Sequence, residues 1–382
     1  MNYILVDTNK KNFLPLTYTR PVSDLRIGIY KISEKWEKLL DCKPSCLTES
    51  YLSAKYPVKF GDKNIFINAK FLPTPALIEQ ILSLEVNQKL IHGVDWVAVC
   101  SAENELNIST TQSSFPAETG TIIEHWWDLF KYNGIEIEND IQNSAMLNLS
   151  FLNENIYVIG DEEKLYLHPN AKVDGVSFNT TLGSIYVGED TEIMEGTLIR
   201  GPFAILPKST VKMGAKIYGG TTIGPYSKVG GEVKNVVIQG YSNKAHEGYL
   251  GNSVLGEWIN LGADTNASNL KNTFNEVQVW DYQTKNLEKS GETFIGCCIG
   301  DYSKTGINTM LNTGTCIGVN SNVFGEGFPP KFIPNFSWGH NNKVKYEIKK
   351  AVETNQRMST FTGLKFSQAD QEILTYLSKR RE

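Results

Sequence analysis

The sequence predicts an α/β amino-terminal domain, then a parallel β-helix of hexapeptide repeats, then short carboxyl-terminal helices. Three observations support this fold class. The chain has 382 residues, more than one hydrophobic core usually supports. Aliphatic residues recur every six positions in its second half, whereas its first part mixes short strand and helix patterns. We therefore expect domains at residues 1–155, 156–343 and 344–382.

The first domain shows the patterns of short strands and amphipathic helices. Strands are expected at 3–6, 64–67 and 95–100, and helices at 29–40 and 74–84. In the second of these helices, Thr74 is a plausible N-cap, and Pro75 suits the first helical turn because its missing N–H is not needed there.

The six-residue period dominates the second domain. Its first run is Val187, Ile193, Ile199, Ile205, Val211, Ile217, Ile223 and Val229, and its second is Ile299, Thr305, Leu311, Ile317 and Val323. A period of six fits short strands joined by turns and stacked in coils. A β-sandwich would instead show two-residue alternation and strand intervals of about 8–12 residues. We expect each repeated side chain to point into a narrow interior.

Two stretches break the repeat, residues 234–251 and 263–292, and we expect both to leave the coil as loops. Within the second, Glu276-Val277-Gln278-Val279-Trp280 alternates like a strand, which fits either a protruding hairpin or a plain surface loop. After the coil, helices are expected at 344–356 and 367–379, the latter opened by a Ser367-x-x-Asp370 capping box. We expect these helices to pack on the end of the coil or on a neighbouring subunit.

Composition limits the function classes. The 37 Lys and Arg residues against 42 Asp and Glu give a net charge of −5, which offers no electrostatic footprint for nucleic acid or an anionic membrane. The amino terminus lacks a signal-peptide pattern, and no stretch approaches the roughly 18 apolar residues of a spanning helix. We expect a cytoplasmic protein. Its six cysteines lack zinc-site spacing and are expected to be mostly buried free thiols.

Polar residues gather where the repeat first breaks. The segment His246-Glu247-Gly248-Tyr249-Leu250-Gly251 follows Glu232 and Lys234, and the residues Asn260, Ala263 and Asn269 come after it. On these residues and their spacing the chain resembles the acetyltransferase domain of the bifunctional bacterial enzyme that makes UDP-N-acetylglucosamine, which joins an N-acetyltransferase to a uridyltransferase. It resembles most a shorter, divergent branch of that family in Bacteroidetes-type bacteria.

The resemblance implies a left-handed β-helix and a role for each matched position. His246 would be the general base, Glu232 its acidic partner, and Asn269 the residue near the reacting amine. Lys234 would hold a sugar phosphate, and Tyr249 and Asn260 would contact the sugar. Acetyl-CoA, as co-substrate, would meet the backbone of Ala263. The family's lysine for the CoA phosphates has no aligned counterpart here, and Lys271, which lies close by in the sequence, is the candidate for that role. The family's sites lie between subunits of a homotrimer.

The chemistry explains why such residues are needed. An amine attacks a thioester only when it is neutral, and an imidazole that titrates around pH 6.5 can accept its proton. A carboxylate would orient the imidazole, and a backbone N–H would stabilise the oxyanion. Each position also has a structural alternative: a histidine bonded to a carbonyl for His246, a surface ion pair for Glu232 with Lys234, and corner packing for Tyr249 and Asn260.

The amino-terminal domain resembles a reduced, Rossmann-type sugar-nucleotidyltransferase. The segment Leu14-Pro15-Leu16-Thr17 and the pair Arg20-Pro21 match that family weakly, and the loop after the first strand contains no glycine. Arg20 could meet a substrate phosphate or form a surface ion pair. The resemblance implies UTP or dTTP as partner and Mg²⁺ as metal, although Asp7 and Asp95 are only guesses for its ligands, which remain unknown.

The sequence thus favours a transferase that acetylates an amino sugar 1-phosphate, such as glucosamine-1-phosphate. Nucleotidyl transfer forming a UDP- or dTDP-sugar for cell-envelope precursors could be coupled to it. The alternative is a nucleotide-sugar-binding or regulatory protein with a degenerate amino-terminal domain. A zinc hydratase on the same scaffold would need converging histidines, yet His168, His246 and His340 lie far apart in the sequence.

Overall fold

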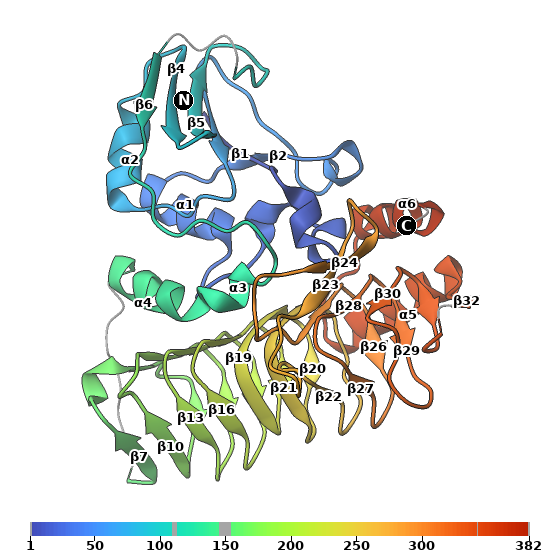
Figure 1. Ribbon diagram of the computed structural model, residues 1–382. Coiled ribbons are helices and arrows are strands. Elements are labelled where there is room, and N and C mark those ends of the chain that lie inside the picture. Colours follow the sequence, from blue (N-terminus) through green and yellow to red (C-terminus); the bar gives the residue numbers. More distant parts are fainter. Residues whose placement is uncertain (1, 109–112, 145–153, 342, 381–382) are drawn as a thin grey trace.

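A computed structural model describes residues 2–108, 113–144, 154–341 and 343–380. It confirms the predicted fold class: an α/β domain, a parallel β-solenoid and carboxyl-terminal helices (Figure 1). The first domain holds a six-stranded mixed sheet in the order β2-β1-β3-β5-β4-β6. Its strands are β1 (Asn2–Val6), β2 (Ser45–Leu47), β3 (Asn64–Asn68), β4 (Gln88–His92), β5 (Asp95–Ser101) and β6 (Ser113–Pro116).

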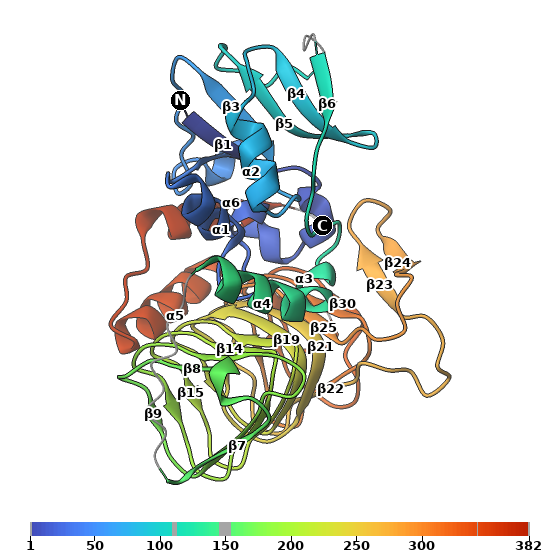
Figure 2. The same cartoon turned by 90° about the vertical axis from the view of Figure 1, so that its left-hand side faces the viewer.

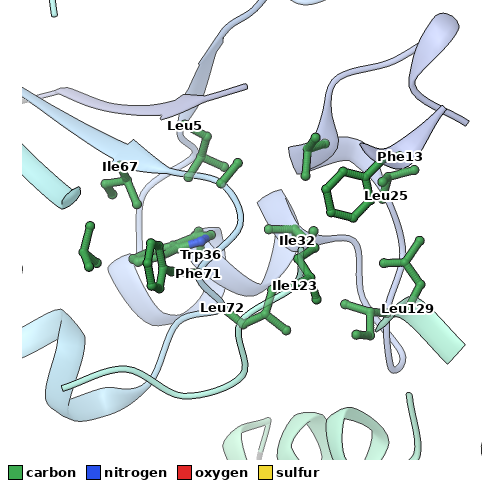
Figure 3. Packing of buried hydrophobic residues seen from close by; sticks show 14 of the residues in the cluster. Leu5, Phe13, Leu25, Ile32, Trp36, Ile67, Phe71, Leu72, Ile123 and Leu129 are labelled. Carbon is green, nitrogen blue, oxygen red and sulfur yellow. The ribbon is translucent and has the colours of Figure 1, made fainter. Parts of the chain in front are cut away.

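Four helices accompany this sheet: α1 (Ile32–Leu40), α2 (Pro75–Leu82), α3 (Asp128–Lys131) and α4 (Asn133–Asn143). The Thr74 hydroxyl accepts a hydrogen bond from the N–H of Leu77 at 3.1 Å, so the predicted cap of α2 is confirmed. Trp36 of helix α1 lies on one face of the sheet together with Leu5 and Ile67 (Figure 3). Leu77 of helix α2 belongs to the same buried cluster. This is the main core of the domain.

The solenoid stacks three ladders of parallel strands, which we call faces 1, 2 and 3. Face 1 holds β7 (Ile156–Ile159), β10 (Val176–Asn179), β13 (Leu198–Arg200), β16 (Lys216–Tyr218), the first part of β19 (Glu232–Gly240) and of β21 (Tyr249–Glu257), β22 (Asn266–Ala267) and β27 (Met310–Leu311). Face 2 holds β8 (Leu165–Leu167), β11 (Ile185–Val187), β14 (Phe203–Ile205), β17 (Thr221–Ile223), the ends of β19 and β21, β25 (Cys297–Ile299), β28 (Thr315–Ile317) and β30 (Phe332–Ile333). Face 3 holds β9 (Lys172–Val173), β12 (Glu192–Ile193), β15 (Thr210–Val211), β18 (Lys228–Val229), β20 (Asn243–Lys244), β26 (Lys304–Thr305), β29 (Asn322–Val323), β31 (Ser337–Trp338) and the antiparallel β32 (Val344–Lys345).

The repeated aliphatic residues fill the solenoid, as the period predicted. All eight residues of the first run are at most 2 % exposed, and Ile299, Leu311, Ile317 and Val323 of the second run are equally buried. Burial of such a side chain stabilises the fold by roughly 1.5–3 kcal/mol relative to exposure. The interior stack is therefore a main source of the stability of this domain.

The prediction that residues 234–251 leave the coil as a loop is wrong, because this segment stays in the coil as parts of β19, β20 and β21. Val211 pairs with Val229, and Val229 pairs with Lys244. Fewer residues separate Val229 from Lys244 than separate Val211 from Val229. The coil becomes shorter here, since β19 and β21 are nine-residue strands that continue from face 1 onto face 2. The period therefore ends although the stacking continues.

The second excursion contains the predicted hairpin. Strands β23 (Gln278–Asp281) and β24 (Asn286–Lys289) pair antiparallel, so the plain-loop alternative is wrong. Trp280 stacks on Phe332 with ring centroids 4.0 Å apart, and Gln283 donates to the Asn12 side chain at 3.3 Å. The hairpin thus connects the coil to the amino-terminal domain.

The amino-terminal domain lies on face 2, with α3 and α4 between its sheet and the coil (Figures 1 and 2). Val237, Val254 and Cys298 point outward from face 2 into the core of that domain. Arg26 and Asn133 add polar contacts, to Gln239 and to the Gly220 carbonyl at 2.9 Å. The outer side of face 2 thus forms part of the apolar core of the amino-terminal domain.

Two helices complete the chain, α5 (Ile348–Phe361) and α6 (Gln368–Lys379). The Ser367–Asp370 capping box is confirmed. Helix α5 begins later than expected, because Val344 and Lys345 form β32 instead. Both helices pack against Trp258 and Tyr302 of the coil and Leu52 of the amino-terminal domain. They therefore cover a junction within this chain rather than only the end of the coil.

A buried ion cluster ties the two domains together at Arg20, and this corrects the expectation that Arg20 meets a phosphate or a surface partner. Its guanidinium is 2 % exposed, lies 2.8 Å from the Glu257 carboxylate and pairs with Asp301, both on the coil. Burial raises the pKa of Glu257, but Arg20 and Lys31 outweigh it and hold that pKa well below its usual range. Arg20 is thus an interdomain anchor.

Four of the cysteines, Cys100, Cys297, Cys298 and Cys316, are buried free thiols as expected, whereas Cys42 is exposed. Among the helices that the structure describes, none has both the length and the apolar character needed to cross a membrane.

Arg20→Ala should lower the free energy of unfolding by about 3–5 kcal/mol, because it leaves the buried carboxylate of Asp301 without its cation and Glu257 with only the more distant Lys31. Urea unfolding followed by fluorescence measures the loss. Lys350→Ala is the control, since it removes an exposed pair with Glu347, 3.2 Å away, and should cost under about 1 kcal/mol. Equal losses in the two variants would contradict an anchoring role for Arg20.

Candidate functional site

Three of the predicted site residues lie side by side on the outer surface of face 1. Glu232 pairs with Tyr249 across β19 and β21, and Lys234 pairs with Gly251. Val233 and Leu250 point inward, so the side chains of Glu232, Lys234 and Tyr249 point outward by strand alternation. Within the described chain, Lys234 has no carboxylate within ion-pair distance, so the alternative of a Glu232–Lys234 ion pair is not formed.

His246 is exposed at the corner between face 3 and face 1, in the turn that precedes Tyr249. That turn rests directly on Gly231: a Cβ at residue 231 would lie 3.0 Å from the His246 carbonyl oxygen and 2.9 Å from that of Gly248. Gly231 also has φ +71°, which favours glycine. Residue 231 therefore brings the His246 turn onto the coil next to Glu232, although no hydrogen bond joins the two side chains in the described structure.

Tyr249 lies flat on the strand rather than standing away from it. A Cβ at Gly251 would lie 2.3 Å from the Tyr249 hydroxyl oxygen, so only glycine leaves room for the ring there. Burial raises the pKa of Tyr249, the nearby Glu232 carboxylate raises it further, and a hydrogen bond with the Asn269 side chain lowers it. Tyr249 thus stays a neutral phenol between Glu232 and Asn269.

Asn269 lies at the corner between faces 1 and 2, in a ladder of asparagines. Its amide nitrogen donates to the Asn252 side-chain oxygen at 2.7 Å. Asn252 donates in turn to Asn235 at 3.0 Å, once the Asn235 amide is oriented to satisfy its partners. The ladder orients Asn269, and its remaining amide capacity faces Tyr249.

The other predicted residues lie at three further places. Ala263 occupies the corner beside His246 in the next coil, where its carbonyl accepts from the Asn308 N–H at 2.8 Å. Asn260 points outward from face 3, half-buried. Lys271 lies in the insertion after Asn269, where its ammonium donates to the Glu276 carbonyl at 2.5 Å. The structure therefore gathers His246, Glu232, Lys234, Tyr249, Asn269 and Ala263, but leaves Asn260 and Lys271 at the margins.

Sequence reasoning missed two residues of this region. Tyr218 lies beside Lys234 on β16 and is 37 % exposed, which widens the polar and aromatic surface of face 1. Lys244 lies inside the coil beneath the His246 turn and is 2 % exposed. The shortened coil between Val229 and Lys244 is the signal that could have revealed Lys244, because the shortening puts this lysine at an interior position.

The amino-terminal domain has its own polar edge, where β1 and β3 end. Asp7 accepts hydrogen bonds from the Val22 N–H at 2.8 Å and the Thr48 hydroxyl at 2.6 Å. The Lys70 ammonium lies 2.8 Å from Asp95 and 2.7 Å from Glu124. Because both guessed ligands already have these partners, Asp7 and Asp95 do not fit a shared Mg²⁺ ion. The described residues of this one chain contain no group of three His, Cys, Asp or Glu that could hold a metal.

A cleft of about 560 Å³ opens between α1, β2 and the segment 55–59. Both lysines and carboxylates line it, among them Lys31, Lys43, Glu37 and Lys59. Cys46 also borders this cleft, and burial raises the pKa of its thiol to about 12, so it stays protonated. The cleft has the size of a small-molecule site.

Comparison with known proteins matches residues 3–146 to the sugar nucleotidyl transferase family. A bifunctional sugar-1-phosphate nucleotidylyltransferase/acetyltransferase of Sulfurisphaera tokodaii is 31% identical over 144 residues, 37% of this chain and 35% of that protein. The bifunctional protein GlmU of Trichormus variabilis is 25% identical over 205 residues, covering 50% and 41%. A putative uncharacterized acetyltransferase, YaiX of Escherichia coli K12, is 26% identical over 174 residues, covering 44% and 75%. The chain thus spans little more than a third of the length of the bifunctional relatives that it matches.

Gly231→Ala should destabilise the protein by about 2–3 kcal/mol, because a Cβ there adds close contact with the His246 turn to the strain of a positive φ. Gly93→Ala is the matched control: its φ is +59° and a Cβ there meets nothing within 4 Å, so only the strain of about 1 kcal/mol remains. Thermal unfolding of both variants measures the difference. Equal melting temperatures would show that the turn does not rest on residue 231.

Proposed function

We propose that the chain is a divergent member of the GlmU-like family of nucleotidyltransferases and acetyltransferases, and that it moves an acetyl group from acetyl-CoA to the amine of an amino sugar 1-phosphate. The observation that carries the proposal is the arrangement on face 1. There the exposed His246 borders a surface that presents an acid, a lysine without a carboxylate partner in the described chain, and a tyrosine, namely Glu232, Lys234 and Tyr249.

In the proposed reaction the neutral amine attacks the thioester carbon. A carbon–nitrogen bond forms, and the amine proton passes to the imidazole of His246. The carbon–sulfur bond then breaks, CoA leaves as a thiolate, and the imidazolium returns the proton to it. Glu232 stabilises the imidazolium by its charge, since the His246 turn and Glu232 lie on adjacent coils.

The remaining residues bind the two substrates in this proposal. Lys234 holds the sugar phosphate, because it is exposed and has no carboxylate partner among the described residues. Tyr249 supplies a ring face and a hydroxyl to the sugar, and Asn269 orients the amine. The N–H of Ala263, which has no acceptor in the part of the chain described, is free to polarise the acetyl carbonyl. Asn260 and Lys271 extend this site toward sugar and CoA.

The site lies open on one face of the coil, so a second copy of the chain would be needed to exclude water from it. A homotrimer, as the family resemblance implies, would bring another chain against each open face. We propose that activity depends on this assembly, in the cytoplasm, where acetyl-CoA is available.

A second candidate function concerns the amino-terminal domain, whose match to sugar nucleotidyl transferases favours binding of a nucleotide or nucleotide sugar. Arg20 is buried in an ion cluster and no carboxylates converge on a metal position among the described residues. We propose that the domain binds UTP, dTTP or the corresponding sugar nucleotide without transferring the nucleotidyl group.

His246→Ala should lower the rate of CoA release from acetyl-CoA with glucosamine-1-phosphate by about 100-fold or more, because the amine loses its proton acceptor. A thiol-detecting assay measures this rate. His168→Ala, a half-buried histidine of the coil that accepts from the Asn170 N–H, is the control and should keep the full rate. Unchanged turnover in His246→Ala would refute the proposed mechanism.

Titration calorimetry with UTP, dTTP and UDP-N-acetylglucosamine tests the second candidate. Saturable binding is expected, with no pyrophosphate released when UTP and a sugar 1-phosphate are supplied together with Mg²⁺. Release of pyrophosphate would establish a nucleotidyltransferase instead. The absence of any binding heat would leave the domain without a nucleotide role.

A further inference from the structure

Lys244 occupies a place in the coil that is aliphatic in all but one of the other coils. Its column of inward residues on face 3 runs Val173, Ile193, Val211, Val229, Lys244, Leu261, Thr305 and Val323. Lys244 is 2 % exposed and its stem packs between Val229 and Leu261 in this column. An aliphatic residue would fill this position at no electrostatic cost.

The ammonium of Lys244 turns back to the corner that carries His246. Its Nζ donates a hydrogen bond to the main-chain carbonyl of His246 at 2.7 Å. The carboxylates that act on it are those of Glu247 in the same turn and Asp264 in the next coil, and neither forms an ion pair with it. The carbonyl of His246 is therefore the one hydrogen-bond partner of this cation in the described structure.

Such a placement opposes folding. Burial lowers the pKa of Lys244 to about 8, partly offset by Glu247 and Asp264. Because the folded pKa lies below the unfolded one, the protein gains stability as the pH rises from about 8 toward about 10.4. A residue that only filled the coil would not carry this penalty, so the contact with the His246 turn is the feature that distinguishes lysine from leucine here.

We propose that Lys244 is a positioning residue for the acetyl transfer proposed above: its ammonium holds the His246 carbonyl from inside the coil and thereby fixes the turn from which the imidazole meets the amine. The catalytic part of this inference rests on the proposed function, whereas the hydrogen bond from Lys244 to the His246 carbonyl does not depend on that function. Lys244 takes no proton from the substrate and acts only through His246.

The contact can be tested without activity. Of the five histidines only His246 precedes a glutamate, so carbonyl-¹³C histidine and ¹⁵N glutamate labelling of the full chain gives one correlated signal, from the His246–Glu247 peptide. We expect this carbonyl resonance to shift with a midpoint near pH 8 in the wild type and to lose that step in Lys244→Met. A step that persists in Lys244→Met, or is absent from the wild type, overturns the proposal.

The catalytic consequence is tested on the same variant. Lys244→Met should fold with at least wild-type stability at pH 7, and its kcat should be about 10-fold lower with KM changed less than about 2-fold. The wild-type kcat should fall above pH 8, where Lys244 loses its proton, and this fall should be absent from Lys244→Met. Lys304→Met is the matched control, since Lys304 lies on the same face, has a pKa lowered to about 8 by burial and donates to the Tyr302 carbonyl at 2.9 Å.

The outcomes separate the two proposals. A wild-type pH profile and kcat in Lys244→Met overturn the positioning role, as does an equal loss in Lys304→Met. An inactive wild type whose His246 carbonyl still titrates near pH 8 refutes the proposed function alone and supports the contact of Lys244 with the turn.

Discussion

The stacking of inward side chains under parallel strands is the constraint on which the rest of this molecule depends. Each coil contributes aliphatic residues that rest on those of the coil before, and hydrogen bonds between strands about 4.8 Å apart fix the register. Once the inward residues are fixed, alternation fixes the outward ones as well. Glu232 and Tyr249 become neighbours for this reason, although a full coil of chain separates them in the sequence.

The same stacking joins the candidate site to the amino-terminal domain through two long strands. Strand β19 carries Glu232 at its start and Gln239, the partner of Arg26, near its end. Strand β21 carries Tyr249 at its start and ends at Glu257, the partner of Arg20. The residues that position the amino-terminal domain and those that line the face 1 surface thus lie on the same two strands. A shift of the domain would have to be accommodated by the strands that carry the site.

Features that depend on neighbouring residues or on the six-residue period could be predicted from the sequence. Contacts between residues that meet only when the chain packs could not. The capped helix at Thr74 and the inward aliphatic runs follow from local patterns, and the structure confirms them. The alternation at 276–280 left a hairpin and a plain loop open, and the structure shows the hairpin. Arg20 was misjudged because its carboxylates lie in another domain and nothing near it in the sequence announces them. The segment 234–251 was misjudged because a strand that turns a corner removes the period without leaving the coil. The grouping of Glu232, Lys234 and Tyr249 was expected from a family resemblance, and the pairing of β19 with β21 supplies its physical cause.

The coil that carries His246 differs from its neighbours in three ways that support one another. It is shorter, and its corner turn rests on Gly231. Its interior contains an ammonium at a position that is aliphatic in the other coils except at Thr305, and this ammonium gives the turn a hydrogen-bond donor from inside the coil. Its outward strand holds a tyrosine that lies flat because the residue two positions on is glycine. A regular coil maximises apolar contact, whereas this one gives up part of that contact and carries a histidine, a tyrosine and a glutamate at or beside one outer surface. The loss of the repeat and the grouping of these side chains therefore occur in the same part of the coil.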